Sequence, residues 1–206
     1  MSAAEAADVV LMEAVMVLAA FAYNPLHRQA RKMIQEGAVG EVKLARGSFS
    51  FFLDRPNDVR WDAALGGGSL WDVGSYPVSF IRWIVGEPNQ VFGWQTLSGS
   101  GVDDAFAGLL QYDRGVLGAF DCGFRAPFRS EAEVVGTDGT LLIERPYPIA
   151  PQRSRLLLRH RGEDEARVVA VAEEDAYQCE VEALTAAVLD GAPGSMVRPA
   201  HHRRSH

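Results

Sequence analysis

Lysine is nearly absent from this chain, because its 206 residues include only two, Lys32 and Lys43. The two glycine motifs that bind nucleotide phosphates are also missing. No G-x-G-x-x-G follows a predicted strand, and no G-x-x-x-x-G-K-[ST] occurs. The nearest fragment, Gly99-Ser100-Gly101, has no third glycine and leads into acidic residues. These absences predict that the chain carries no nucleotide-binding half of its own.

Positive charge and cysteine are scarce as well. A formal net charge of −7 argues against a nucleic-acid-binding surface and against docking on an anionic membrane. Cys122 and Cys179 lie far apart in the sequence, with no C-x-x-C pattern and no histidine nearby. We therefore expect free, buried thiols and no metal site.

The longest apolar run, from Val9 to Ala22, is shorter than the roughly 20 residues that cross a bilayer. Glu13 interrupts it, and the residues before it include Glu5 and Asp8 but no basic residue. That pattern is unlike a secretory signal. We therefore expect a cytoplasmic protein with no membrane partner.

The rest of the chain predicts a strand-rich fold with a few helices. Helices are expected from Asn24-Pro25 to Gly37, from about Ser69 to Val85, and from Ala176 to Leu189. Strands are expected at 41–53, 91–97, 105–112, 116–124, 131–135, 141–144, 155–160 and 167–171. Residues 54–64 are expected to form a polar loop. The predicted fold class is α+β, with a large, mostly antiparallel open β-sheet and helices packed on one face.

The most informative segment runs from Gly66 to Pro77 and reads Gly-Gly-Gly-Ser-Leu-Trp-Asp-Val-Gly-Ser-Tyr-Pro. A glycine run lets backbone approach a ligand closely, and the predicted helix after it carries Asp72 and Tyr76. Their spacing of four places both side chains on one helix face, about 5–6 Å apart at Cβ, as a proton-transfer pair requires. The simpler interpretation is a glycine-rich turn before a helix with one aspartate in its first turn, favoured by the helix dipole.

Six segments, read in order, carry a family resemblance. They are Leu11–Ala14, Gly37–Val42, Gly66–Pro77, Val102–Ala105, Gly136–Thr140 and Tyr177–Glu182. Their order and spacing resemble the C-terminal domain of the Gfo/Idh/MocA family of NAD(P)-dependent oxidoreductases. The resemblance implies one domain over residues 24–192 and a remnant of an inter-domain segment at 1–23. Residues 193–206 lack an apolar period and are expected to be a disordered tail, and both ends look like those of a fragment or an altered reading frame.

The resemblance also implies that cofactor binding and substrate binding belong to two different domains. In the family an N-terminal Rossmann domain holds NAD or NADP, and the sheet domain binds a sugar, polyol or related hydroxy compound. Many members have histidine where Tyr76 stands, and a tyrosine there is similar to the aldose and dihydrodiol dehydrogenase branch. The resemblance implies Tyr76 as the catalytic acid beside Asp72. A phenol has a pKa of about 10 and needs a nearby cation to react at neutral pH. The family supplies this cation from a Glu-Lys-Pro motif, which this chain lacks.

Weaker predictions concern the residues before the helix. Asn57, Arg60 and Trp61 are expected to line a sugar pocket, although Trp61 suits the core equally well. Gly67 and Gly68 are expected to contact the cofactor.

Three functions remain open. The first is the substrate-binding and catalytic-acid domain of an NAD(P)-dependent oxidoreductase, inactive alone and without tight dinucleotide binding. The second is a non-catalytic dimerisation or partner-binding module with a residual pocket, and the third is a free-standing sugar-binding protein. The partners expected are a small-molecule substrate, a second copy bound through the open sheet, and a separate Rossmann domain.

Overall fold

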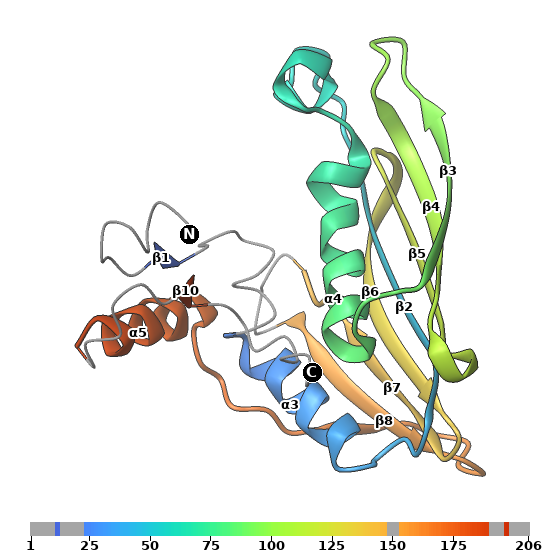
Figure 1. The fold of residues 1–206 in the computed structure, drawn as a ribbon, viewed down its shortest axis with the longest axis vertical. Coiled ribbons are helices and arrows are strands. Elements are labelled where there is room, and N and C mark those ends of the chain that lie inside the picture. Colours follow the sequence, from blue (N-terminus) through green and yellow to red (C-terminus); the bar gives the residue numbers. More distant parts are fainter. Residues whose placement is uncertain (1–10, 13–22, 148–152, 190–195, 198–206) are drawn as a thin grey trace.

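The computed structural model describes residues 11–12, 23–147, 153–189 and 196–197. An eight-stranded sheet with the order β3-β4-β5-β2-β6-β7-β8-β9 dominates this part of the chain (Figure 1). Its strands are β2 (Val42–Phe52), β3 (Gln90–Leu97), β4 (Asp103–Gln111), β5 (Leu117–Gly123), β6 (Arg125–Gly136), β7 (Gly139–Glu144), β8 (Arg155–His160) and β9 (Arg167–Val169). Within this eight-stranded sheet only β2 and β5 pair in parallel, and every other neighbouring pair is antiparallel. The predicted α+β class with a mostly antiparallel open sheet is confirmed.

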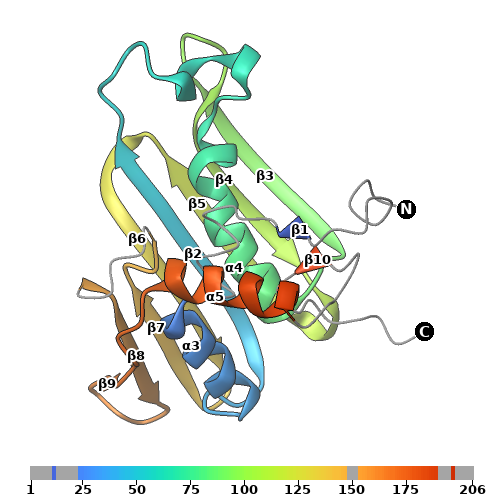
Figure 2. The same cartoon turned by 90° about the vertical axis from the view of Figure 1, so that its left-hand side faces the viewer.

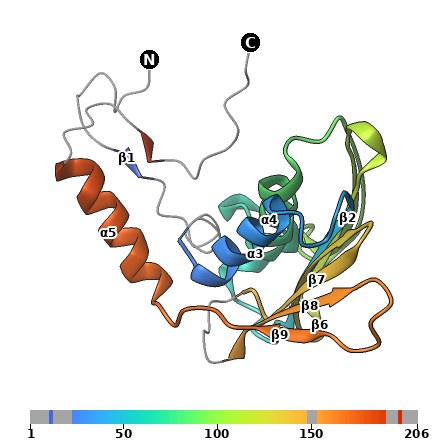
Figure 3. The same cartoon turned by 90° about the horizontal axis from the view of Figure 1, so that it is seen from below.

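In the described part of the chain, three helices lie on one side of this sheet (Figures 2 and 3). They are α3 (Pro25–Gln35), α4 (Ser75–Val85) and α5 (Ala176–Leu189). The N-terminus of α3 follows from its sequence, because Asn24 accepts a hydrogen bond from the Leu26 amide at 2.8 Å and Pro25 occupies the first turn. None of the described helices has the length and apolar character needed to cross a membrane.

Two glycines in the central strands let α4 lie close against the sheet. A Cβ on Gly47 of β2 would lie 2.8 Å from the Pro77 Cβ, and one on Gly118 of β5 would lie 2.9 Å from Ile81. Phe80 and Ile81 are accordingly almost fully buried. The helix that carries the candidate site is therefore fixed on the sheet by core packing.

The opposite side of the sheet, which we call the open face, faces away from α4. Along it Phe92 pairs with Leu109 and Leu109 pairs with Ala119, so these side chains point the same way. A hollow of about 620 Å³ lies on this face, lined in part by Phe92, Trp94, Leu109 and Asp121. Large apolar side chains are thus left outside the core.

Some boundaries differ from the sequence-based expectation. β6 begins at Arg125 instead of residue 131, because its first half pairs only with β2 while β7 joins at Glu131. Pro127 is tolerated there, since one side of the strand is a free edge. The expected polar loop contains two 3-10 turns, Val59–Trp61 and Ala63–Leu65.

At the chain ends, β1 (Leu11–Met12) pairs in parallel with β10 (Met196–Val197). Two residues of the segment expected to be disordered are thus part of a strand pair. The rest of residues 193–206, and all of 1–23 except Leu11, Met12 and Tyr23, lie outside the described residues. The expected domain division therefore stays a prediction.

Candidate functional site

The predicted helix over 69–85 exists, but it begins with a π-helical turn at Leu70–Gly74 and becomes α-helical only at Ser75. A π turn is wider than an α turn and is frequent at functional sites. Asp72 lies in this turn, and Tyr76 lies in the first turn of α4. Asp72 is thus held in a π-helical turn and Tyr76 in an α-helix. Their spacing of four in the sequence did not reveal this difference.

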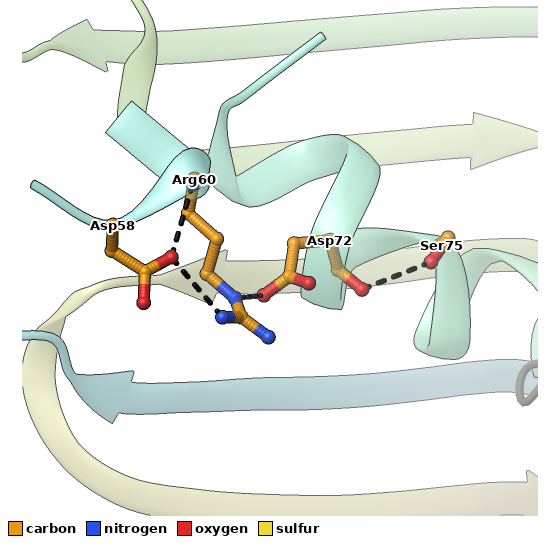
Figure 4. Close-up of polar contacts among 4 residues, drawn as sticks. All are labelled: Asp58, Arg60, Asp72 and Ser75. Atoms are coloured by element: carbon orange, nitrogen blue, oxygen red, sulfur yellow. Dashed lines mark hydrogen bonds and ion pairs between the residues drawn. The ribbon is translucent and has the colours of Figure 1, made fainter. Parts of the chain in front are cut away.

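Arg60 bridges two carboxylates at this point (Figure 4). Its Nε donates to Asp72 Oδ2 at 2.6 Å, and its Nη1 lies 3.2 Å from Asp58 Oδ1. The same Asp58 oxygen accepts from the Arg60 backbone amide at 3.1 Å. That backbone bond, with the Arg60 charge, lowers the pKa of Asp58 below its usual range. Arg60 therefore ties the loop before the glycine run to the turn that carries Asp72.

Tyr76 is a buried phenol in an aromatic cluster. Its side chain is 8% exposed, and its ring centroid lies 5.2 Å from that of Phe49 and 5.3 Å from that of Tyr147. Burial raises the pKa of Tyr76, the negative charge of Asp72 and then Tyr177 raise it further, and Arg60 opposes them. The phenol is therefore protonated at neutral pH and can donate a hydrogen bond, and its raised pKa makes it a weaker acid than a free phenol.

Neither lysine of the chain supplies the cation that a reactive phenol needs. Lys32 on α3 lies 3.9 Å from Glu36, and Lys43 on β2 lies 2.9 Å from Glu41. Both ion pairs lie on the protein surface, outside the cluster around Tyr76. Arg60 is a cation that lowers the pKa of Tyr76, and it already forms ion pairs with the carboxylates of Asp58 and Asp72.

The other residues predicted to line the sugar pocket, Asn57 and Trp61, have different surroundings in the structure. Trp61 is half-buried, packs edge-on against Phe124 at 5.3 Å between ring centroids, and lies under the Arg125 guanidinium. Its packing favours the core interpretation over the sugar-pocket one. Asn57 is exposed in a turn and lines a separate shallow hollow with residues 54–58. The structure thus brings Arg60 to Asp72 but leaves Asn57 apart.

The amides of Gly67 and Gly68 are not free to bind a dinucleotide pyrophosphate. The Gly67 amide donates to the Asp62 carbonyl at 2.8 Å and the Gly68 amide to the Arg60 carbonyl at 2.9 Å. Two residues after Gly68, the amide of Leu70 is occupied by the carboxylate of Asp103 at 2.7 Å. Cofactor contact through Gly67 and Gly68 stays a prediction, limited to contacts that use no amide donor.

Two residues with clear contacts at the site had no predicted role. Asp103 begins β4 and binds the start of the π turn, while Cys122 of β5 lies beneath Gly74. Each lies more than thirty residues from its partner, so no local pattern could pair them. The Cys122 thiol is buried as expected, whereas Cys179 is only half-buried, and both are free.

Comparison with known proteins agrees with this architecture. Residues 27–142 match the model of the GFO/IDH/MocA C-terminal domain. The chain is 34% identical over 191 residues to a D-xylose 1-dehydrogenase (NADP(+)) from Haloferax volcanii, which covers 91% of this chain and 56% of the relative. It is 33% identical over 145 residues to the trans-1,2-dihydrobenzene-1,2-diol dehydrogenase of Mus musculus, with coverage of 69% and 42%.

Solved structures show the same fold. The 3-ketoreductase KijD10 from Actinomadura kijaniata, in complex with NADP and TDP-benzene, superposes with a TM-score of 0.75 at 24% identity, covering 84% of this chain and 54% of that one. The aldose-aldose oxidoreductase from Caulobacter crescentus, complexed with glycerol, gives a TM-score of 0.75 at 22% identity, with coverage of 84% and 52%.

Fold and matches together define a C-terminal sheet domain of oxidoreductase type. The chain belongs to the Gfo/Idh/MocA family. It spans about half the length of the curated relatives it matches. Those relatives are sugar and dihydrodiol dehydrogenases and a deoxysugar 3-reductase.

Proposed function

We propose that the chain is the substrate-binding and catalytic-acid domain of an NAD(P)-dependent oxidoreductase that acts on a sugar, polyol or related hydroxy or carbonyl compound. The observation that carries the proposal is the buried Tyr76 phenol, kept protonated beside the Asp72–Arg60 ion pair. NAD or NADP belongs to a separate Rossmann domain. The chain alone is inactive and binds dinucleotide weakly.

The chemistry assigned to this chain is a proton transfer. When a carbonyl is reduced, the nicotinamide bound by the Rossmann domain would supply the hydride and Tyr76 would supply the proton to the reacting oxygen. When an alcohol is oxidised, the hydride would return to the nicotinamide and the hydroxyl proton to the tyrosinate. At neutral pH the phenol carries the proton that carbonyl reduction requires, whereas alcohol oxidation requires the tyrosinate. Asp72 accepts a hydrogen bond from a substrate hydroxyl, while Arg60 keeps its carboxylate in place.

The first test is titration of the chain with NADH and with NADPH, followed by nicotinamide fluorescence, in the presence and absence of D-xylose. We expect no saturable binding up to millimolar cofactor. Micromolar binding by the chain alone would contradict the proposal, because part of this sheet domain would then hold the dinucleotide unaided.

The second test concerns the pocket itself and uses saturation-transfer NMR with D-xylose. Asp72→Asn removes one charged hydrogen-bond acceptor and should weaken binding by roughly ten- to 150-fold, since such a bond contributes roughly 1.5–3 kcal/mol. Tyr112→Phe is the matched control, because this buried tyrosine lies near Arg82 and Glu87, outside the site. Equal affinity of all three proteins would place the sugar elsewhere.

The open face supports the second candidate function, a dimerisation module. Phe92 and Trp94 are 77% and 81% exposed, and Leu109 and Leu117 are also largely exposed on the same face. Contiguous apolar surface of this kind is typical of protein–protein interfaces. A second copy packed on this face would cover these side chains, and the same surface would serve as an interface in the oxidoreductase.

Sedimentation velocity tests the dimer. Trp94→Glu places a charge among the exposed apolar side chains of the open face and should convert a dimer into a monomer. Trp71→Glu is the control, because Trp71 is 76% exposed in the π turn on the helix side of the sheet. A wild-type chain that stays monomeric at high micromolar concentration would reject this interface.

A further inference from the structure

The carboxylate of Asp103 caps the site helix from a distant strand. Asp103 is the first residue of β4, and its Oδ2 accepts the Ser69 hydroxyl at 2.6 Å and the Leu70 amide at 2.7 Å. The first amides of a helix lack partners within the helix, so a side chain must satisfy them. Here that side chain comes from 33 residues away.

Ser69 itself does not cap the helix, although serine is among the best residues for that role. Its backbone is right-handed helical, with φ −70° and ψ −31°, and its side chain makes no cap bond. A capping serine normally has extended backbone. Asp103 thus replaces the local cap, and the helical geometry extends one residue further back than a serine cap would allow.

Gly68 makes room for this contact. Its φ is +117°, and a Cβ at this position would collide with Asp103 Oδ1. Both carboxylate oxygens therefore lie against the chain segment that opens the π turn. The same Ser69 Oγ also lies 3.7 Å from Cys122 Sγ, so the start of the turn contacts the two neighbouring strands β4 and β5.

We propose that Asp103 is the positioning residue of the site. It fixes where the π turn begins and thereby sets the directions of Asp72 and Tyr76, without touching the substrate. This inference rests on the proposed function, because it assigns to Asp103 the alignment of that function's acid and its hydroxyl acceptor.

Three substitutions distinguish a positioning role of Asp103 from an effect of its charge and from a general loss of structure. Asp103→Ala removes both bonds. Asp103→Asn keeps one carbonyl oxygen, which suffices because both bonds converge on Oδ2. Asp104→Asn is the neighbouring control, since Asp104 binds Thr96 and Arg125 instead of the π turn.

The main readout is the phenol pKa of Tyr76, measured by NMR of ring-labelled tyrosine and assigned with Tyr76→Phe. We expect Asp103→Ala to lower this pKa toward its ordinary value, because the phenol loses burial and its fixed distance to Asp72. Asp103→Asn and Asp104→Asn should keep the wild-type value. A folded Asp103→Ala protein with unchanged Tyr76 pKa and unchanged Leu70 amide exchange would overturn the proposal.

A measurement on the wild-type chain keeps the proposal testable if Asp103→Ala fails to fold. The Leu70 amide should exchange with solvent slowly, because it donates to the Asp103 carboxylate. Ser69→Ala should leave that protection in place, since the Leu70 bond remains. A Leu70 amide that exchanges as fast as an unprotected amide would overturn the proposal.

These readouts need no substrate, so they are independent of the proposed function. If D-xylose fails to bind any of the proteins, the proposed substrate class fails while the positioning role stands. If D-xylose binds the wild type, Asp103→Ala should weaken it about as much as Asp72→Asn does, and Asp103→Asn should restore it.

Discussion

Replacement of Gly74 by alanine tests the packing of the π turn on the sheet. The Gly74 backbone is right-handed helical, with φ −69° and ψ −27°, so alanine fits the conformation. Its Cβ, however, would lie 2.7 Å from Cys122 Sγ and 3.0 Å from Leu70 Cδ1. The substitution therefore sets a favourable backbone effect against steric crowding by two identified atoms, of which Cys122 Sγ is the nearer.

The two effects have known sizes. Alanine is more favourable than glycine in a helix by about 1 kcal/mol. Overpacking a well-filled core costs roughly 1–3 kcal/mol. We therefore expect Gly74→Ala to lower the free energy of unfolding by about 0–2 kcal/mol. In a Cys122→Ala background the clashing sulfur is gone, and the same substitution should raise the free energy of unfolding by up to about 1 kcal/mol.

Urea unfolding of the wild type, the two single variants and the double variant measures the coupling, which we expect to be about 1–3 kcal/mol. Gly99→Ala is the matched control, because a Cβ there meets no atom within 4 Å. If Gly74→Ala changes stability equally in both backgrounds, to within about 0.5 kcal/mol, the close approach of Gly74 to Cys122 is refuted.

Two further predictions concern pH and the core. Burial raises the pKa of Cys122 and of Tyr112 to about 12, so the folded chain keeps both protonated while the unfolded chain loses these protons at about pH 9 and 10. Stability should be complete below about pH 9 and fall as the pH rises toward 12, as measured by circular dichroism, and a rise over this range would contradict it. Phe80→Ala should cost about 3–5 kcal/mol in urea unfolding, because Phe80 is 1% exposed, whereas Phe52→Ala at an exposed position should have little effect.

Local sequence signals predicted the elements that depend on local chemistry. The helix at Ala176–Leu189 and the strand at Arg155–His160 were predicted with the bounds that the structure gives. The Asp113-Arg114-Gly115 turn joins β4 to β5 as expected, with Arg114 at φ +60° and Gly115 at φ +73°. Each of these features is fixed by residues next to one another in the chain, so the sequence alone reveals it.

The site was predictable only in part, since its geometry depends on contacts between distant segments. The sequence identified Asp72, Tyr76 and Arg60 as candidates, and the structure brings Arg60 to Asp72. The sequence did not indicate that the Arg60 guanidinium forms ion pairs with both Asp58 and Asp72. Nor could it reveal the π turn, because that turn is held by Asp103 and Cys122 on two strands of the sheet.

The glycines of the site segment show why such a pattern is easily taken for a ligand cradle. A Cβ on Gly67 would lie 2.5 Å from the Arg60 carbonyl oxygen, one on Gly68 would meet Asp103, and one on Gly74 would meet Cys122. A Cβ on any of these three glycines would thus meet an atom of the protein itself. The pattern specifies a tightly folded turn that directs Asp72 and Tyr76, and it would persist in a chain that never met a cofactor. Conservation of these glycines among relatives would therefore indicate that the shape of this turn is kept. Only conservation of the side chains at 72 and 76 would indicate that the chemistry is kept.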